Sequence, residues 1–193
     1  MALTRPAPGE WTYDDLLALP DDGRRWEIIE GVLHEMSGPS WAHGAIVVNL
    51  LLAWAHVVRS VGGVIATAPV GVFFEGANPV QPDLHVALPG NPGHVSRRGF
   101  EGVPDLVVEI LSPSTRGHDL LTKRALYARA GVREYWLVDP DTRAIDVLAF
   151  DGENYRTAQR TTANDVAHSL LLPELSIPLA EVFAQLEQGP QPS

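Results

Sequence analysis

Cysteine is absent from this 193-residue sequence, and its absence excludes several kinds of chemistry. The chain forms no disulfide, no thiolate nucleophile and no cysteine-ligated zinc site. The seven histidines do not compensate, because none of them forms an HExxH motif or a closely spaced pair. Any metal site is therefore expected to rest on oxygen ligands.

Targeting and membrane signals are also lacking. The start MALTRPAPGEW has no apolar region of a signal peptide. The longest apolar stretch, AIVVNLLLAWAHVV, is interrupted by Asn49 and His56 and falls short of the ~20 residues of a membrane span. We expect a cytoplasmic protein without membrane contact, built as one domain over 1–193 with a core at about 10–150 and frayed termini.

Positive charge is scarce, with 14 Lys and Arg against 24 Asp and Glu and a net charge of -10. This balance argues against non-specific nucleic-acid binding as the main activity, because phosphate neutralisation needs basic residues. It leaves room for a nucleic-acid enzyme with a local basic patch. The densest basic cluster comprises Arg97, Arg98, Arg116, Lys123, Arg124, Arg129 and Arg133.

Hydrophobic periodicity predicts the order of helices and strands. A helix is expected over 12–19, with Thr12 as N-cap and Asp15 three residues on, and another from Trp41 to Gly62 or Gly63, with Ser40 as N-cap. Two more helices are expected over 119–130 and 179–186.

Strands are expected as a hairpin at 26–36, with its turn near Glu30 and Gly31, and at 64–74, with a break or bulge at Pro69. Further strands are expected at 83–88, 105–112 and 134–140, and an exposed hairpin at 143–150 and 154–158. The segment 89–102 is expected to be a loop. The strand at 134–140 follows a helical crossover and should pair in parallel, which predicts an α/β (α+β) fold with a mixed central sheet flanked by helices.

Glu109 stands in the middle of an apolar strand, PDLVVEILSPST. Strand alternation places it on one face with Asp105 and Val107, and places Asp83 and His85 on one face of the preceding strand. If the two strands are neighbours in suitable register, Asp83 and Glu109 converge. Mg²⁺ between the two carboxylates, with the backbone carbonyl of Ile110 as a further ligand, would relieve their repulsion.

Lys123 is the only lysine of the chain. Lysine and arginine are not interchangeable at a site, so a single lysine among arginines is informative. It lies about one turn into the helix after the strand of Glu109, and its stem is long enough to return the ammonium to the carboxylates. There it would orient an attacking water or neutralise a phosphate.

Each of these residues also has a purely structural interpretation. Asp83 follows a proline and suits a strand-capping turn, a pairing that recurs at Asp21, Asp105 and Asp141. Glu109 suits a buried ion pair, for example with Arg124 or Lys123. These alternatives stay open at the level of the sequence.

The sequence resembles the PD-(D/E)xK nuclease superfamily and, within it, the Uma-two family of restriction-endonuclease-like proteins. The resemblance is carried by WEIIEGVLHEMSGPSWAH, QPDLHVAL, PDLVVEILSPST and, after Lys123, ALYARAGVREYWLVDP. It implies a restriction-endonuclease-like fold and a Mg²⁺- or Mn²⁺-dependent endonuclease acting on DNA.

The resemblance also implies roles for individual residues. Asp83 and Glu109 match the two acids of the motif, and Glu27 matches a further acid that would ligate metal or hold a water. The usual lysine position is Leu111 here, and Lys123 takes over the role from the next helix. The remaining candidates are His85, on the face of Asp83, and His43, near Glu27 in the family pattern. For both histidines, a role in packing or helix capping is the alternative to a role in the site.

Two functions of different classes follow from these residues. One is a metal-dependent DNA endonuclease that uses Asp83, Glu109, Lys123 and Glu27. The other is a catalytically inactive nuclease-fold protein that serves as a binding or assembly module, which suits the acidic net charge. We also expect a homodimer. Its contact would be an apolar surface of the 143–158 hairpin or of the C-terminal helix, which together span 143–187.

Overall fold

The computed structural model describes residues 6–36, 38–75, 78–112 and 118–186. Its helices are α1 (Tyr13–Leu17), α2 (Trp41–Ser60), α3 (His118–Ala130) and α4 (Leu179–Val182). Its strands are β1 (Arg25–Ile29), β2 (Val32–Met36), β3 (Val64–Thr67), β4 (Gly71–Phe73), β5 (Leu84–Ala87), β6 (His94–Val95), β7 (Gly99–Glu101), β8 (Leu106–Ile110), β9 (Glu134–Asp139), β10 (Ala144–Phe150), β11 (Tyr155–Thr162), β12 (Val166–His168) and β13 (Ser176–Pro178). The terminal segments 1–5 and 187–193, which were expected to fray, and Arg116 of the basic cluster lie outside the described residues.

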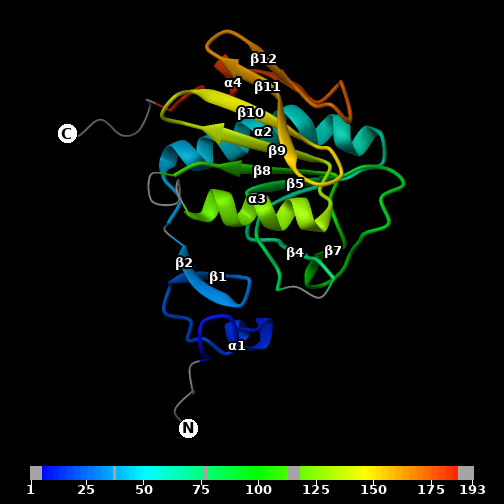
Figure 1. Ribbon diagram of the computed structural model, residues 1–193. Coiled ribbons are helices and arrows are strands. Elements are labelled where there is room, and N and C mark those ends of the chain that lie inside the picture. Colours follow the sequence, from blue (N-terminus) through cyan, green and yellow to red (C-terminus); the bar gives the residue numbers. More distant parts are fainter. Residues whose placement is uncertain (1–5, 37, 76–77, 113–117, 187–193) are drawn as a thin grey trace, which may run out of the picture.

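A six-stranded mixed sheet forms the centre of the molecule, in the order β11-β10-β9-β8-β5-β3 (Figure 1). Strands β8 and β9 pair in parallel, and the other neighbours pair antiparallel. The parallel pair is the one joined by helix α3, as the crossover rule requires. The predicted mixed α+β class is therefore confirmed.

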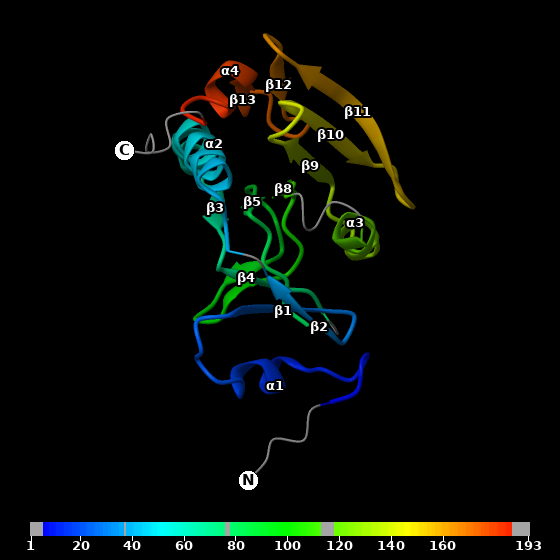
Figure 2. The ribbon, with the colours of Figure 1, turned by 90° about the vertical axis from the view of Figure 1, so that its left-hand side faces the viewer.

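Helices α2 and α3 cover opposite faces of this sheet (Figure 2). On the α2 side, Ile46, Leu50, Trp54 and Val58 pack in one cluster with Leu84, Val86, Leu106 and Val108. On the α3 side, Leu126 and Tyr127 pack in a second cluster with Val107 and Tyr135. Alternate residues of β8 thus serve two cores, which explains why every residue of this strand except Glu109 is apolar.

Helix α2 is 20 residues long, begins at Trp41 as predicted and ends at Ser60, just before the predicted glycine stop. By length and composition it meets the criterion for a membrane-spanning helix, which is weak evidence because core helices meet it too. Here one stripe of α2 packs against the central sheet. Ser40 caps its start, as predicted, by accepting a hydrogen bond from the backbone N–H of His43.

The β1–β2 hairpin with α1 forms a separate layer at the α3 side of the sheet (Figures 1 and 2). The predicted turn is found at Glu30 and Gly31, both with positive φ. The predicted start of α1 is also confirmed, since Thr12 and Asp15 form a capping box.

Several predicted boundaries are wrong. The segment 89–102 is not only a loop, because it contains β6 and β7, which build a small sheet with β4. The break expected at Pro69 within 64–74 is confirmed: β3 ends before it and β4 begins after it, and the two strands belong to different sheets.

The C-terminal part also differs from expectation. The 143–158 hairpin is not exposed in its first strand, because β10 pairs with β9 and buries Ile145 and Val147. The two strands β12 and β13 were not foreseen. Ile177, from β13, and Val182, from α4, join the main core. Helix α4 ends at Val182, four residues before the predicted end.

Candidate active site

Asp83 and Glu109 lie opposite one another on neighbouring strands. In the antiparallel β5–β8 pair, Leu84 faces Val108 and His85 faces Val107. Continuing this register by one residue sets Asp83, just before β5, against Glu109. Both carboxylates therefore lie at the α3 face of the sheet, as strand alternation predicted.

Glu109 is held from helix α3. The ammonium Nζ of Lys123 lies 3.1 Å from Oε1 and 3.2 Å from Oε2 of Glu109. The hydroxyl of Tyr127 donates a 2.6 Å hydrogen bond to Oε1. Lys123 and Tyr127 are four residues apart and therefore lie on one face of α3. The lysine stem does reach back to the sheet, as expected from the sequence.

Glu27 joins the cluster from the N-terminal hairpin. Its Oε2 lies 3.3 Å from Nζ of Lys123, so one ammonium bridges Glu27 and Glu109. Its Oε1 accepts a 2.9 Å hydrogen bond from the backbone N–H of Gln81. Glu27 thereby ties strand β1 both to α3 and to the segment that carries Asp83.

Asp83 closes the cluster on the side of α2. Its Oδ2 accepts a 2.7 Å hydrogen bond from the backbone N–H of Ile110, and its Oδ1 lies 3.0 Å from Nε2 of His43. The side chains of His43 and Asp83 are 22% and 12% exposed, against 5% for Glu27. Solvent therefore reaches these two residues more readily than it reaches Glu27.

The charges of the cluster do not balance, since three carboxylates face one ammonium. Burial raises the pKa of Glu109 to about 7; the ammonium of Lys123 opposes this rise, and the carboxylates of Asp83 and Glu27 add to it. Burial alone would lower the pKa of Lys123, but the carboxylates of Glu109, Glu27 and Asp83 outweigh it and raise that pKa above its ordinary value. Lys123 stays charged, and Glu109 takes up a proton near neutral pH.

This donor set fits a hard divalent cation. Mg²⁺ binds through one or two carboxylates and keeps several waters, and a cation would replace the proton that Glu109 otherwise needs. Among the described residues, no three His, Asp or Glu side chains are grouped as a complete ligand cage. The pair Asp83 and Glu109 is thus suited to an ion that retains water, not to a site closed by protein.

His85 lies apart from these contacts. It is buried, and its ring centroid is 5.7 Å from that of Phe100. Burial lowers the pKa of His85 to about 4, so the ring is neutral. Its Nδ1 is buried without a hydrogen-bond partner among the described residues, whereas His43, the other histidine candidate, contacts Asp83 directly.

Two groups that contact the cluster were not predicted from the sequence. One is the backbone of Gln81, which no side-chain pattern reveals. The other is Tyr127, whose spacing of four residues from Lys123 on a helix was a usable signal.

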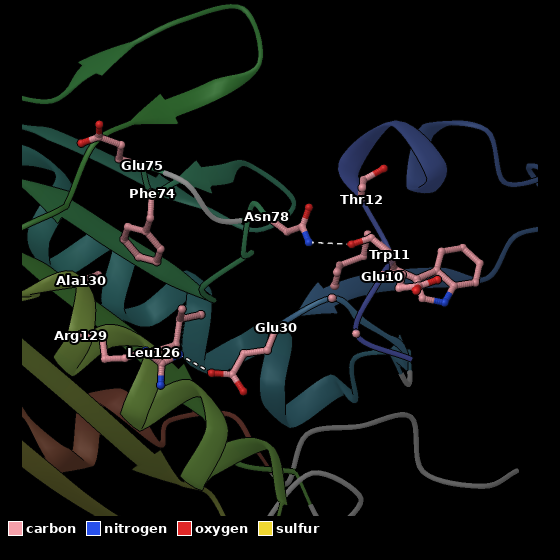
Figure 3. Close-up of a pocket in the computed structure, with 13 residues that line it drawn as sticks. Glu10, Trp11, Thr12, Glu30, Phe74, Glu75, Asn78, Leu126, Arg129 and Ala130 are labelled. Atoms are coloured by element: carbon pink, nitrogen blue, oxygen red, sulfur yellow. Dashed lines mark hydrogen bonds and ion pairs between the residues drawn. The ribbon is translucent and has the colours of Figure 1, made fainter. Parts of the chain in front are cut away.

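A separate pocket of about 440 Å³ lies between the N-terminal segment, the β1–β2 turn and α3 (Figure 3). It is lined by Gly9, Glu10, Trp11, Thr12, Ile28, Glu30, Gly31, Phe74, Glu75, Asn78, Leu126, Arg129 and Ala130. Asn78 donates a hydrogen bond to the carbonyl of Trp11, and Arg129 pairs with Glu30 (Figure 3). None of the four clustered residues Glu27, Asp83, Glu109 and Lys123 lines it, so the pocket and the cluster are distinct features.

A mixed sheet between helices, with two acids on adjacent strands and a nearby lysine, defines the class of restriction-endonuclease-like folds. The chain belongs to the Uma2 family, described as "Putative restriction endonuclease", whose model matches residues 13–180. A search of curated proteins found no match.

A solved structure with the same fold comes from Anabaena variabilis ATCC 29413. It is described as the crystal structure of "a putative nuclease belonging to DUF820". The TM-score is 0.72 at 21% sequence identity, over 90% of this chain and 97% of that chain. At this identity the likeness establishes the fold.

Proposed function

We propose that this protein is a metal-dependent endonuclease that hydrolyses phosphodiester bonds of DNA. Membership of a family described as restriction endonucleases supports nuclease function in general. The observation that carries the finer proposal is the cluster itself, in which Asp83, Glu109 and Glu27 outnumber the single ammonium of Lys123. In this proposal the protein works in the cytoplasm, and homodimer formation stays a prediction from the sequence.

In this proposal Asp83 and Glu109, with the backbone carbonyl of Ile110, hold Mg²⁺ or Mn²⁺. The ion, when bound, would make a bound water more acidic and stabilise charge on the phosphate. Lys123 keeps its proton, orients Glu109 and Glu27 through its 3.1 and 3.3 Å contacts, and orients the attacking water. Glu27 assists by fixing Lys123.

The histidines support the acids in this proposal without binding the ion. His43 holds one oxygen of Asp83, and the N–H of Ile110 holds the other, so this carboxylate has a fixed orientation. His85 supports the face of the sheet beneath the site through its packing on Phe100. Fixed carboxylates lower the reorganisation that catalysis requires.

A second function is a catalytically inactive nuclease-fold protein that acts as a binding or assembly module. It is favoured by the net charge of -10, and by the internal pairing of Glu109 with Lys123 and Tyr127. Ion pairs of this kind also occur as purely structural features.

Mn²⁺ titration by calorimetry and a plasmid-cleavage assay distinguish the two functions. We expect the wild type to bind Mn²⁺ and to cleave, and Asp83→Asn and Glu109→Gln to lose both while still melting cooperatively. Glu134→Gln is the matched control, because Glu134 is also a buried carboxylate but bonds to Trp136 and Ser169 outside the cluster.

Loss of activity in the two cluster variants, with activity kept in the control, would assign the chemistry to the cluster. A wild type that neither binds Mn²⁺ nor cleaves would favour the binding module. Equal cleavage by Glu109→Gln would show that this carboxylate is not required.

A further inference from the structure

Tyr127 is buried completely in the middle of helix α3. Its ring meets Phe74 and Tyr135 edge-on, at centroid distances of 6.2 and 5.3 Å. These contacts restrict the ring, and the 2.6 Å hydrogen bond aims its hydroxyl at Oε1 of Glu109. A buried hydroxyl on a fixed ring is a rigid donor, unlike a lysine on a flexible stem.

The two oxygens of Glu109 are engaged unequally. Oε1 receives the hydroxyl of Tyr127 at 2.6 Å and the ammonium of Lys123 at 3.1 Å. Among the described residues, Oε2 receives only Lys123, at 3.2 Å. Tyr127 and Lys123 thus donate one hydrogen bond each, to Oε1 and to Oε2, and Oε1 is also in ion-pair contact with the ammonium. Oε2 is therefore the less crowded oxygen and keeps an acceptor site for a further partner.

We propose that Tyr127 is a positioning residue that fixes the carboxylate of Glu109, so that an ion binds through Oε2. This inference rests on the proposed metal-dependent function and adds a residue to it. Groups that hold a ligand in place typically change metal affinity by about 10- to 100-fold when they are lost.

Two neighbouring tyrosines show that this contact belongs to Tyr127 and not to the ring cluster as a whole. The hydroxyl of Tyr135 is buried without a hydrogen-bond partner, and that of Tyr155 donates to the carbonyl of Val132. Tyr135 packs against both of the other rings. Tyr135→Phe therefore removes a buried hydroxyl from the same environment without touching Glu109, and is the matched control for Tyr127→Phe.

The test compares Mn²⁺ affinity in wild type, Tyr127→Phe and Tyr135→Phe by calorimetry. We expect Tyr127→Phe to bind Mn²⁺ at least about tenfold more weakly and Tyr135→Phe to bind as the wild type does. In cleavage assays, Tyr127→Phe should lose kcat at limiting Mn²⁺, recover it at saturating Mn²⁺ and keep its KM for DNA. A general packing defect would not be rescued by the metal.

Metal-free crystal structures of the two variants give a readout that does not depend on binding. We expect the Glu109 carboxylate to rotate in Tyr127→Phe and to stay in place in Tyr135→Phe. An unmoved carboxylate, or wild-type Mn²⁺ affinity in Tyr127→Phe, overturns the inference. A wild type that binds no Mn²⁺ contradicts the proposed function instead, and the two structures then still decide whether Tyr127 positions Glu109.

Discussion

Glu109 is the residue at which burial and charge conflict most strongly. It is 7% exposed and shares its surroundings with Glu27 and Asp83, while Lys123 supplies the single ammonium. Burial therefore raises the pKa of Glu109 to about 7, and a proton completes the charge balance of the metal-free cluster. A divalent cation would displace that proton.

The affinity for Mn²⁺ should depend on pH for this reason. Below the pKa of about 7, Glu109 is protonated, so binding releases one proton and affinity falls about tenfold per pH unit. Well above pH 7 the carboxylate is already ionised and the dependence on pH should vanish. Calorimetry in buffers of different ionisation enthalpy counts the protons. Constant affinity from pH 6 to 8 without proton release would contradict this account.

Lys123→Met should separate metal binding from cleavage. It leaves Glu27 and Glu109 without their ammonium, and loss of one partner of a buried ion pair typically costs about 3 kcal/mol of unfolding free energy. Because Mn²⁺ can supply the missing charge, the variant should bind it and gain more unfolding free energy from it than the wild type, yet not cleave DNA. Urea denaturation with and without Mn²⁺ measures this effect.

Arg124→Met is the control for that variant. Arg124 is the next residue of α3, but its guanidinium donates to the carbonyl of Tyr155, away from the cluster. It should not change the stabilisation by Mn²⁺. Lys123→Met could instead lose Mn²⁺ binding as completely as Glu109→Gln. That result would contradict the account in which the carboxylates bind the metal and the ammonium serves cleavage.

Strand alternation predicted the faces of Asp83 and Glu109, because the face follows from backbone geometry. Their convergence also required the two strands to be neighbours in suitable register, and the β5–β8 pair provides this. Alternation could not tell what each side chain meets. His85 was placed on the correct face but packs on Phe100, and Tyr127 went unnoticed although it bonds Glu109. Such contacts depend on how helix α3 packs on the sheet. The spacing of residues along one strand carries no information about that packing.

Among the elements, α2 connects fold and site most directly. Its first turn presents His43 to Asp83, and Ser40 caps that turn through the N–H of His43. The cap was predictable from serine before an apolar helical run. The break of the 64–74 strand at Pro69 was predicted as well. The pairing of β4 with β7 was not, because β7 lies about thirty residues away in the sequence.

Ser40→Ala should cost about 1 kcal/mol of unfolding free energy, the usual effect of losing an N-cap. Thr12→Ala is the comparison, since Thr12 also caps a helix, but α1 has five residues and buries none of them. We expect a smaller loss there, measured by urea denaturation. An equal or larger loss in Thr12→Ala would show that α2 is not anchored through its first turn.

At the scale of the whole molecule, the cluster gathers residues from distant parts of the chain. Glu27 comes from β1, Asp83 from the residue just before β5, Glu109 from β8 and Lys123 from α3. The inclusion of Glu27 came only from the family resemblance, because nothing in the local sequence links the N-terminal hairpin to the central sheet. The contact with Lys123 and the hydrogen bond from Gln81 supply that link.

The most direct test is a crystal soaked in Mn²⁺ and measured at the manganese absorption edge. The account predicts one anomalous peak between the carboxylates of Asp83 and Glu109, within bonding distance of both, and no such peak in Glu109→Gln. A fully soaked wild-type crystal without density at that position, or an equal peak in the variant, would contradict it.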